Sequence, residues 1–566
     1  MKFFPKKLNL TWLNSAYKNG DLSPQELLEE IIRRAEETAE KNIWIVPPSK
    51  ELVQKYIDNL PKDRENYPLW GIPFAIKDNI DLADVPTTAA CKEFTYTPKK
   101  SAFVVQNLID AGAIPVGKTN LDQFATGLVG TRSPYGEVHN SHNPDLISGG
   151  SSSGSSVSVA LGMATFSLGT DTAGSGRVPA MLNTLVGFKP PLGSWSTAGV
   201  VPACASLDCV TVFANSLGDA KIVDSQARGF DKDCIWSKEY EIKGEKSAKT
   251  IFLPKTEPRF YGDYADICRK KWQNAVKRIE KLPINIEYID YKMFSDAALI
   301  LYEGAYVAER WEDLKSFIEN SEGKTFPVTE KILRSGDKAE NTAAKLFGNL
   351  HELQMYRHKA KMLLKDAVMV MPTAGGTFSR AQVRENPIET NSLMGLYTNH
   401  CNLLDMFAVA IPENTKDTNI PFGITVFSLS DSENLVLDMC EKFLESESLK
   451  ICVCGIHKKG RALESQLTEL GAEFSEHTTT AKEYKLYELD TKPLKPGLVR
   501  VLDGGECIEV DVYSLPKTKL ASFMENVSSP LNIGDVKLIN GEYIKGFLCE
   551  NYIIETAKDI TDKKSF

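Results

Sequence analysis

The chain has 566 residues, and since a domain usually takes roughly 100 to 200 residues, this length predicts more than one domain. Hydrophobic residues make up 42% and charged residues 25%, which is typical of a globular protein and excludes a chain that is disordered throughout. The formal net charge is −9 and no block of basic residues occurs, so we expect no binding to nucleic acid or to a membrane surface.

The first half of the chain predicts alternating helices and strands. Ser23-Pro24-Gln25-Glu26 has the pattern of a capping box, which predicts a helix from residue 24 onward. Further along, the hydrophobic patterns predict a strand at 74–82, a helix at 101–112, a strand at 113–118, a helix at 156–164 and a strand at 165–171. Helix-rich sequence from about 265 to 368 follows. This alternation predicts an α/β domain with a mixed central sheet covered by helices.

The character of the sequence changes near Ser448, where a short polar run ends. The residues beyond it are rich in short β-type segments, and we therefore expect two domains, 1–447 and 448–566, the second a small β-rich α+β domain. The predicted strands lie within 450–456, 484–490, 497–504, 507–515 and 543–550.

The eleven cysteines are scattered from Cys91 to Cys549 without the spacing of a disulfide framework, which predicts a reducing compartment. Cys452 and Cys454 lie in an apolar run and are interpreted as strand residues rather than metal ligands, so no metal or other cofactor is expected. The N-terminal segment lacks the apolar stretch of a signal peptide, and no run reaches the ~18 apolar residues of a membrane span. We expect a cytoplasmic protein.

One nucleotide-binding pattern can be set aside. Residues 112–119, GAIPVGKT, match the letters of a phosphate-binding P-loop. That site requires a strand, a glycine loop and then a helix, whereas here a predicted helix comes first and the middle residues are strand-like. Pro115 also removes one of the N–H groups that would hold phosphate. We therefore expect no phosphate site here.

Two clusters of small residues, 148–156 and 169–177, dominate the rest of the sequence. Gly/Ser tracts are commonly flexible linkers, and this is the alternative interpretation. Each cluster, however, adjoins a predicted helix or strand, which favours tight turns beside a sheet. In such turns glycine lets the backbone approach a ligand and direct N–H groups at developing negative charge.

These motifs resemble the amidase-signature family. GGSSSG, GTDTAGSGR and the upstream IPFAIKDNID occur in the family's order, and the resemblance covers roughly residues 20 to 440. It implies that Ser175 is the nucleophile, that Ser151 is a bridging serine usually preceded by a cis peptide bond, and that Lys77 is the base. Thr172, Ala173, Gly174 and Ser175 would supply the backbone N–H groups of an oxyanion hole.

The chemistry of the three residues agrees with these roles. A serine hydroxyl needs a base, and none of the seven histidines lies in these motifs. Lys77 can act as the base only if it is uncharged, which requires its pKa to fall from about 10.4 to about 7. This shift corresponds to roughly 4.6 kcal/mol, an amount that full burial can supply. We expect Lys77 to take a proton from Ser151, and Ser151 to take one from Ser175. Arg177 is expected to form an ion pair behind the oxyanion loop.

Three further features resemble allophanate hydrolases, namely residues 301–310, residues 395–412 and the appended C-terminal domain. Allophanate carries a carboxylate beside its amide, and the resemblance implies that Arg310 binds this group bidentately, with Tyr302 as a hydrogen-bond donor and Gly127 lining the pocket. The alternative for residues 309–313 is a solvated helix surface.

The resemblance implies a hydrolase of allophanate that releases ammonia and finally carbon dioxide, downstream of a biotin-dependent urea carboxylase, and it implies a homodimer. The C-terminal part resembles a γ-glutamyl-cyclotransferase-like domain and would process the N-carboxycarbamate intermediate, with His457 as a candidate residue or, alternatively, a structural histidine. Two other functions stay open: the glutaminase subunit of a tRNA-dependent amidotransferase, and an inactive binding or scaffold protein.

Overall fold

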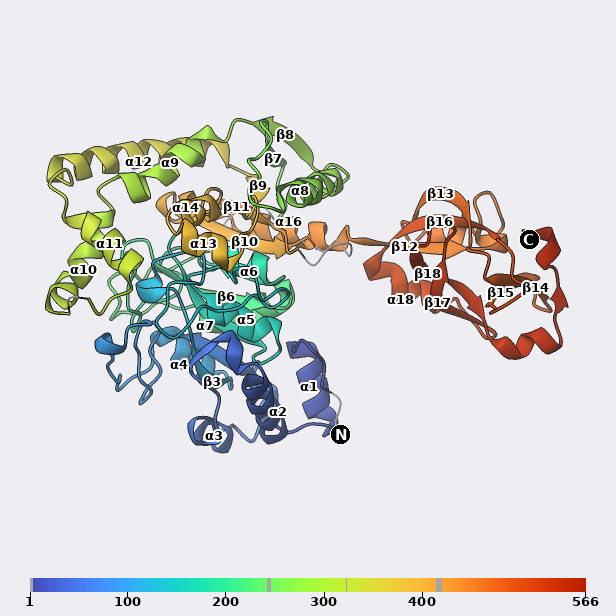
Figure 1. The fold of residues 1–566 in the computed structure, drawn as a ribbon, viewed down its shortest axis with the longest axis horizontal. Coiled ribbons are helices and arrows are strands. Elements are labelled where there is room, and N and C mark those ends of the chain that lie inside the picture. The colour runs from blue at the N-terminus through green and yellow to red at the C-terminus, as the bar shows by residue number, and fades with distance from the viewer. Residues whose placement is uncertain (1–3, 242–245, 322, 414–419) are drawn as a thin grey trace. The chain divides into compact units, whose positions relative to one another are not determined.

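The computed structural model describes residues 4–241, 246–321, 323–413 and 420–566 (Figure 1). The first three residues of the N-terminal segment considered above lie outside the described part. The chain divides into two compact units, Met1–Cys440 and Glu441–Phe566.

The larger unit is built on a mixed sheet of eleven strands in the order β1-β3-β2-β4-β6-β5-β10-β11-β9-β7-β8. The pairs β2–β3, β2–β4, β7–β8 and β7–β9 are parallel and the others antiparallel, which confirms the predicted mixed α/β sheet. The strands are β1 Trp44–Val46, β2 Pro73–Lys77, β3 Ile114–Thr119, β4 Phe166–Asp171, β5 Val186–Lys189, β6 Cys209–Ala214, β7 Thr250–Pro254, β8 Asn285–Ile289, β9 Ala367–Pro372, β10 Met406–Pro412 and β11 Gly423–Leu429.

Helices surround this sheet (Figure 1). The predicted capping box at Ser23 is present and begins α2. The helices are α1 Leu10–Asn19, α2 Pro24–Glu37, α3 Lys50–Asp58, α4 Phe103–Asp110, α5 Ser153–Ala160, α6 Val178–Leu182, α7 Leu217–Ala227, α8 Ala265–Ile279, α9 Lys292–Glu303, α10 Val307–Asn320, α11 Pro327–Arg334, α12 Ala343–Leu363, α13 Arg380–Glu385, α14 Glu389–Met394, α15 His400–Leu403 and α16 Glu433–Glu445.

The parallel pairing of β2 and β4 positions the residues of the candidate site. Ile76 of β2 lies opposite Leu168 of β4, so the carboxyl ends of the two strands meet at one edge of the sheet. Lys77 is the last residue of β2, and the loop that carries Ser175 follows β4. The small-residue cluster at 148–156 ends in α5, and this helix packs against both β2 and β4. The end of β2, the loop after β4 and the start of α5 therefore lie close together, although they are distant in the sequence.

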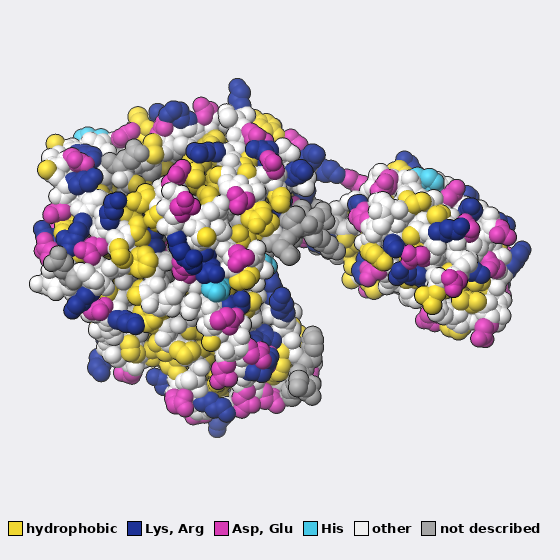
Figure 2. Space-filling view, in the orientation of Figure 1, with side chains coloured by type: hydrophobic (Ala, Val, Ile, Leu, Met, Phe, Trp, Pro, Cys, Tyr) yellow, Lys and Arg dark blue, Asp and Glu magenta, His cyan; other side chains and the backbone are white. Residues whose placement is uncertain are grey.

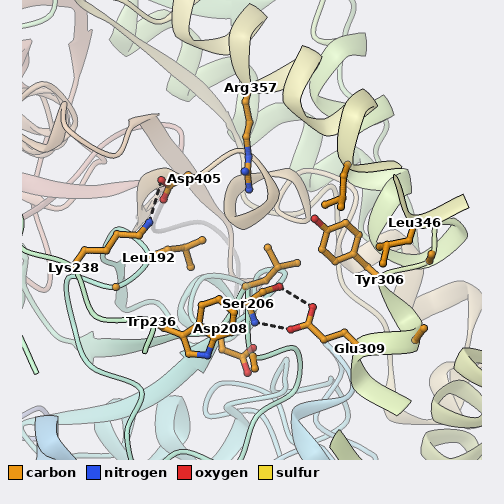
Figure 3. Close-up of a pocket in the computed structure, with 16 residues that line it drawn as sticks. Leu192, Ser206, Asp208, Trp236, Lys238, Tyr306, Glu309, Leu346, Arg357 and Asp405 are labelled. Carbon is orange, nitrogen blue, oxygen red and sulfur yellow. Dashed lines mark hydrogen bonds and ion pairs between the residues drawn. The ribbon is translucent and has the colours of Figure 1, made fainter. Parts of the chain in front are cut away.

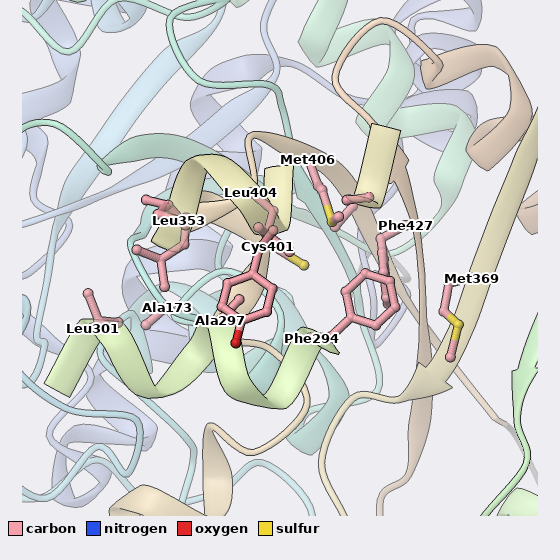
Figure 4. Close-up of a cluster of buried hydrophobic side chains, with 14 of the residues drawn as sticks. Ala173, Phe294, Ala297, Leu301, Leu353, Met369, Cys401, Leu404, Met406 and Phe427 are labelled. Atoms are coloured by element: carbon pink, nitrogen blue, oxygen red, sulfur yellow. The ribbon is translucent and has the colours of Figure 1, made fainter. Parts of the chain in front are cut away.

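A large apolar cluster lies behind this edge (Figure 4). It joins α9, α12 and β9 to β11, and it includes Ala173 from the loop after β4, which is 3% exposed. Burial of side chains such as Phe294 and Phe427 stabilises the fold by roughly 1.5 to 3 kcal/mol each. The loop after β4 is therefore anchored to the main core at Ala173.

The segment with the P-loop letters forms the strand that the sequence predicts. Residues Ile114–Thr119 are β3, and α4 precedes them. Lys118, which a phosphate would need, is fully buried and forms an ion pair with the equally buried Asp78 at 3.0 Å. Its ammonium group is therefore neutralised inside the protein.

The smaller unit contains a five-stranded sheet, β13-β16-β12-β18-β17, and a three-stranded sheet, β15-β14-β19. Two short helices, α17 Ser465–Thr468 and α18 Leu520–Met524, accompany them, which confirms a β-rich α+β region. The strands are β12 Ser448–Val453, β13 Glu473–Thr479, β14 Tyr484–Leu489, β15 Lys495–Arg500, β16 Glu509–Pro516, β17 Leu531–Lys537, β18 Tyr543–Cys549 and β19 Lys558–Asp559. Cys452 lies in β12 as expected of a strand residue, whereas Cys454 lies one residue beyond the end of this strand.

Two observations bear on the kinds of partner that the protein could contact. On the face of the larger unit seen in Figure 2, basic and acidic side chains are interspersed. Within the described ranges, no helix combines the length and the apolar character that crossing a membrane would require.

We predict opposite effects of the same substitution at two helical glycines. A Cβ at Gly154 in α5 would lie 2.3 Å from the carbonyl oxygen of Ile43, whereas a Cβ at Gly348 in α12 has no atom within 4 Å. Gly154→Ala should destabilise the larger unit by roughly 1 to 3 kcal/mol through overpacking. Gly348→Ala should stabilise it by roughly 0.5 to 1 kcal/mol, because alanine loses less backbone entropy in a helix.

Thermal unfolding followed by tryptophan fluorescence measures both effects, because all seven tryptophans lie before residue 440. A melting temperature of Gly154→Ala equal to that of Gly348→Ala would contradict the close packing of α5.

Candidate active site

Lys77 lies at the end of β2 with its side chain fully buried. Its Nζ atom is 2.7 Å from Ser151 Oγ and 2.7 Å from Thr170 Oγ1. Burial lowers the pKa of Lys77 to about 7, although three nearby carboxylates partly oppose this shift. The lysine is therefore in a position to exchange a proton with Ser151 at neutral pH.

Ser151 lies in the loop that precedes α5, and the Gly150–Ser151 peptide bond is cis, as the family resemblance implies. The loop contacts the buried carboxylate of Asp122. A Cβ at Gly150 would lie 2.0 Å from Asp122 Oδ2, and the Asp122 N–H donates to the Ser151 carbonyl at 3.0 Å. Asp122 also accepts hydrogen bonds from three N–H groups of residues 129–132. It thus organises two loops at once.

Ser175 is 4% exposed and lies after β4. Its Oγ atom donates a long hydrogen bond of 3.5 Å to the carbonyl oxygen of Gly127. Among the hydrogen bonds of the described residues, the predicted link from Ser175 to Ser151 does not occur. The structure therefore joins Lys77 to Ser151, while the second step of the relay requires the Ser175 hydroxyl to turn from Gly127. Catalytic hydrogen bonds commonly tighten only when substrate is bound.

The loop that carries Ser175 is held by the fully buried Asp171. Its carboxylate accepts hydrogen bonds from the N–H groups of Gly174 at 2.7 Å and Gly176 at 3.1 Å. Arg177 donates to the same carboxylate through Nε at 2.9 Å and Nη2 at 3.0 Å, which confirms the ion pair expected behind the loop. This charge-assisted pair fixes the loop from its inner side.

One of the four expected oxyanion donors, the N–H of Gly174, is engaged by Asp171 in this structure. The N–H of Gly174 points at the carboxylate and is not directed toward a substrate. The N–H groups of Thr172, Ala173 and Ser175 have no acceptor among the described residues. These three groups are therefore the available donors of the loop.

Asp208 is a further buried carboxylate at this site. It accepts a hydrogen bond from the Thr172 hydroxyl, and the N–H groups of Ala203 and Cys204 donate to it at 2.7 and 3.1 Å. Burial raises the pKa of Asp208. The sequence gives no signal for this residue, because it is an isolated aspartate far along the chain from the loop that it supports.

Gly127, Tyr302 and Arg310 line one cavity of about 170 Å³. Arg310 lies in α10 and is only 4% exposed, and its guanidinium lies 5.7 Å from the centroid of the Tyr302 ring. The alternative of a solvated helix surface is therefore wrong for Arg310, although Glu312 and Asp313 of the same helix are exposed.

A second arginine of this cavity escapes the sequence analysis. Arg132 is 1% exposed, and its Nη atoms donate to the carbonyl oxygens of Thr126 at 3.0 Å and Pro387 at 2.6 Å. Burial lowers its pKa, and the nearby charge of Arg310 adds to this effect. Two arginines in so small a cavity indicate an anionic ligand. Arg132 lies in the segment 130–136, GTRSPYG, where nothing in the sequence pattern distinguishes this arginine from a surface residue.

His457 lies in the smaller unit and is 6% exposed. Its Nε2 atom is 3.0 Å from Gln466 Oε1, and its ring lies 4.9 Å from that of Phe547, centroid to centroid. Burial lowers its pKa, so the ring is neutral at pH 7. These contacts are compatible with the structural alternative, and a catalytic role for His457 stays a prediction.

Comparison with known proteins adds to this geometry. The amidase family model matches residues 26–437. The chain belongs to the amidase family. Residues 449–566 of this amidase match the model described as the allophanate hydrolase C-terminal domain, which confirms the resemblance drawn from the sequence.

The amidase is similar to urea amidolyase of Saccharomyces cerevisiae, with 38% identity over 98% of this chain and 32% of that protein. It spans about a third of the length of the urea amidolyases that it matches. Among solved structures, Kluyveromyces lactis allophanate hydrolase is 36% identical, with a TM-score of 0.72, over 99% of this chain and 98% of that one. The K. lactis urea amidolyase structure gives the same identity and TM-score, over 36% of its own length.

We predict that Lys77→Met stabilises the larger unit. The pKa of Lys77 is about 7 in the folded protein and about 10.5 unfolded. Folding therefore opposes the charged form, and this cost is complete below pH 7 and vanishes as the pH rises toward 10.5. After allowance for the two lost hydroxyl hydrogen bonds, the gain should be about 3 kcal/mol at pH 7.

Urea unfolding followed by tryptophan fluorescence at several pH values between 6 and 10 measures this gain. The exposed Lys361→Met in α12 is the matched control and should change stability little at any pH. If the stability gained by Lys77→Met does not decrease as the pH rises, the pKa of Lys77 is not lowered in the folded protein.

Proposed function

We propose that this amidase is an allophanate hydrolase in which Ser175 attacks the amide carbon and Lys77 is the base. The observation that carries this proposal is the 2.7 Å hydrogen bond between Lys77 Nζ and Ser151 Oγ in a fully buried site, where the pKa of the lysine is about 7. An uncharged amine accepts a proton from a hydroxyl, whereas an ammonium group does not.

The relay moves one proton along two hydroxyls. Lys77 takes the proton of Ser151, and Ser151 takes that of Ser175 as the Ser175 oxygen bonds to the amide carbon. The negative charge on the former carbonyl oxygen meets the free N–H groups of the loop, each worth about 3 kcal/mol in such sites. The proton then returns to the nitrogen, ammonia departs, and water hydrolyses the acyl-enzyme by the same route.

The cavity lined by Gly127, whose carbonyl oxygen accepts the Ser175 hydroxyl, supports a small anionic amide as substrate. Arg310 and Arg132 both line its volume of about 170 Å³, so one carboxylate of a compact molecule is the ligand that it fits. Allophanate has this form, and the similarity to K. lactis allophanate hydrolase over almost the full length of both chains supports the same substrate.

The C-terminal region completes the proposal. We propose a functional boundary near Ser448, which the division into two compact units and the family match to 449–566 support. This domain would process the N-carboxycarbamate, with His457 as a candidate residue, so that ammonia and carbon dioxide are the final products. The reaction would follow a biotin-dependent urea carboxylase in urea degradation, with the enzyme acting as a cytoplasmic homodimer.

Purified protein should release ammonia from allophanate, and kcat/KM should rise with pH through about 7 and then level off, because only uncharged Lys77 is active. Ser175→Ala should lower turnover by a factor of at least about 10³. The assay is coupled ammonia detection between pH 5.5 and 9. Full activity of Ser175→Ala would indicate another catalytic centre, whereas ammonia release from glutamine but not allophanate would indicate a glutaminase.

Arg310→Gln should weaken the preference for a carboxylate. The loss of the charged fork should cost roughly 2 to 3 kcal/mol, so kcat/KM for allophanate and malonamate should fall about thirty- to hundredfold, while that for the uncharged analogue biuret changes little. Arg334→Gln, in the neighbouring α11 and partly exposed, is the control and should retain the parent preference. An unchanged ratio of allophanate to biuret hydrolysis in Arg310→Gln would remove Arg310 from substrate selection.

A further inference from the structure

A second cavity of about 670 Å³ lies in the larger unit (Figure 3), and its lining shares no residue with that of the cavity at Gly127 and Arg310. It is about four times as large as the first, and its size is that of sites for ligands much larger than a small amide. The walls come from residues 192–193, residues 205–208, Trp236, Lys238, Asp405, the turn between α9 and α10, the start of α10, and α12. The proposed reaction makes no use of this space.

Apolar and aromatic side chains form most of the walls. Trp236 and Tyr306 contribute rings, and the leucines 192, 207, 346 and 350 contribute aliphatic surface. Trp236 is 41% exposed, and Leu346 and Leu350 are 37% and 38% exposed. Apolar surface of this kind is typical of a ligand pocket in which a few polar groups fix the orientation of the ligand.

One of those polar groups is the guanidinium of Arg357. Its side chain reaches from α12 toward the space between Asp405 and Tyr306 (Figure 3). The Nε atom donates to the carbonyl oxygen of Leu403 at 2.8 Å, which fixes the plane of the group. No hydrogen bond or ion pair engages its Nη atoms among the described residues. A fixed fork with two free donors is suited to a carboxylate.

Most of the other charges of the cavity have a partner within the protein, although the Oδ1 atom of Asp405 has no hydrogen-bond partner among the described residues. Glu309 accepts hydrogen bonds from the N–H and hydroxyl of Ser206, both at 2.7 Å. Lys238 lies 3.7 Å from Asp405. The carboxylate of Asp208 is buried and holds the loop after β4, as described above. Arg357 is therefore the cation of this lining whose Nη donors are both held in orientation and free for a ligand.

We propose that this cavity binds a small organic carboxylate with an apolar or aromatic body, held by the free Nη donors of Arg357 and packed against Trp236 and Tyr306. The carboxylate forms the bidentate pair, and the body replaces water along the apolar walls. This site is separate from the carboxylate site at Arg310, and its occupation does not depend on the proposed reaction.

Isothermal titration calorimetry of the full chain carrying Ser175→Ala tests the proposal without turnover. The probes are phenylacetate, 2-phenylethanol and 2-phenylethylamine, which share an aromatic body and differ in charge. Phenylacetate should bind at least tenfold more tightly than the other two. Equal or tighter binding of the alcohol or amine, or no binding of phenylacetate, would overturn the proposal.

Variants assign the binding to this cavity. Arg357→Gln should weaken phenylacetate binding at least tenfold, and so should Leu350→Glu, which places a carboxylate at a partly exposed position of the same helix without removing a hydrogen bond. Lys361→Gln in α12 and Arg310→Gln should leave it unchanged. Binding lost in Arg310→Gln and retained in both Arg357→Gln and Leu350→Glu would place phenylacetate in the substrate cavity and refute the second site.

Discussion

The burial of one amine determines the rest of the site. The side chain of Lys77 is enclosed completely, and among the described residues its amine forms hydrogen bonds with the hydroxyls of Ser151 and Thr170. Neither hydroxyl carries a charge, so neither compensates for the hydration free energy that a charged ammonium group loses when it is buried. The buried lysine is unfavourable for stability, and the same burial gives its amine a pKa of about 7 in a place closed to solvent.

Buried carboxylates fix the loops around this amine. The carboxylate of Asp122 holds residues 129–132, and its backbone N–H donates to the carbonyl of Ser151. Asp171 holds the loop of Ser175, and Asp208 holds Thr172 at the start of that loop. Each accepts several N–H or hydroxyl donors, so the backbone is set by acceptors inside the protein before substrate arrives. The same arrangement decides which N–H groups remain free for an oxyanion, and this is why Gly174 differs from its neighbours.

Much of this could be predicted from the sequence, because periodic patterns and local motifs carry it. The mixed sheet, the capping box at Ser23 and the closeness of Lys77 to Ser151 all follow from such signals, the last through the family resemblance. The edge strands β13 and β17 escape prediction. Strand β13 faces solvent and is largely polar, and β17 interrupts its apolar residues with Asn532, Gly534 and Asp535, so neither shows a clear strand pattern. Asp208 and Arg132 were missed because their roles depend on contacts that only the folded chain creates.

The two cavities have linings without a common residue, yet both are bounded by the segment from Tyr302 to Arg310, which gives some of its side chains to one and some to the other. Glu309 and Arg310 are consecutive and face different cavities. Thermodynamic linkage makes any coupling between the two cavities reciprocal. If a ligand in the larger cavity changes the affinity of the smaller one for substrate by some factor, substrate changes the affinity of the larger cavity for that ligand by the same factor.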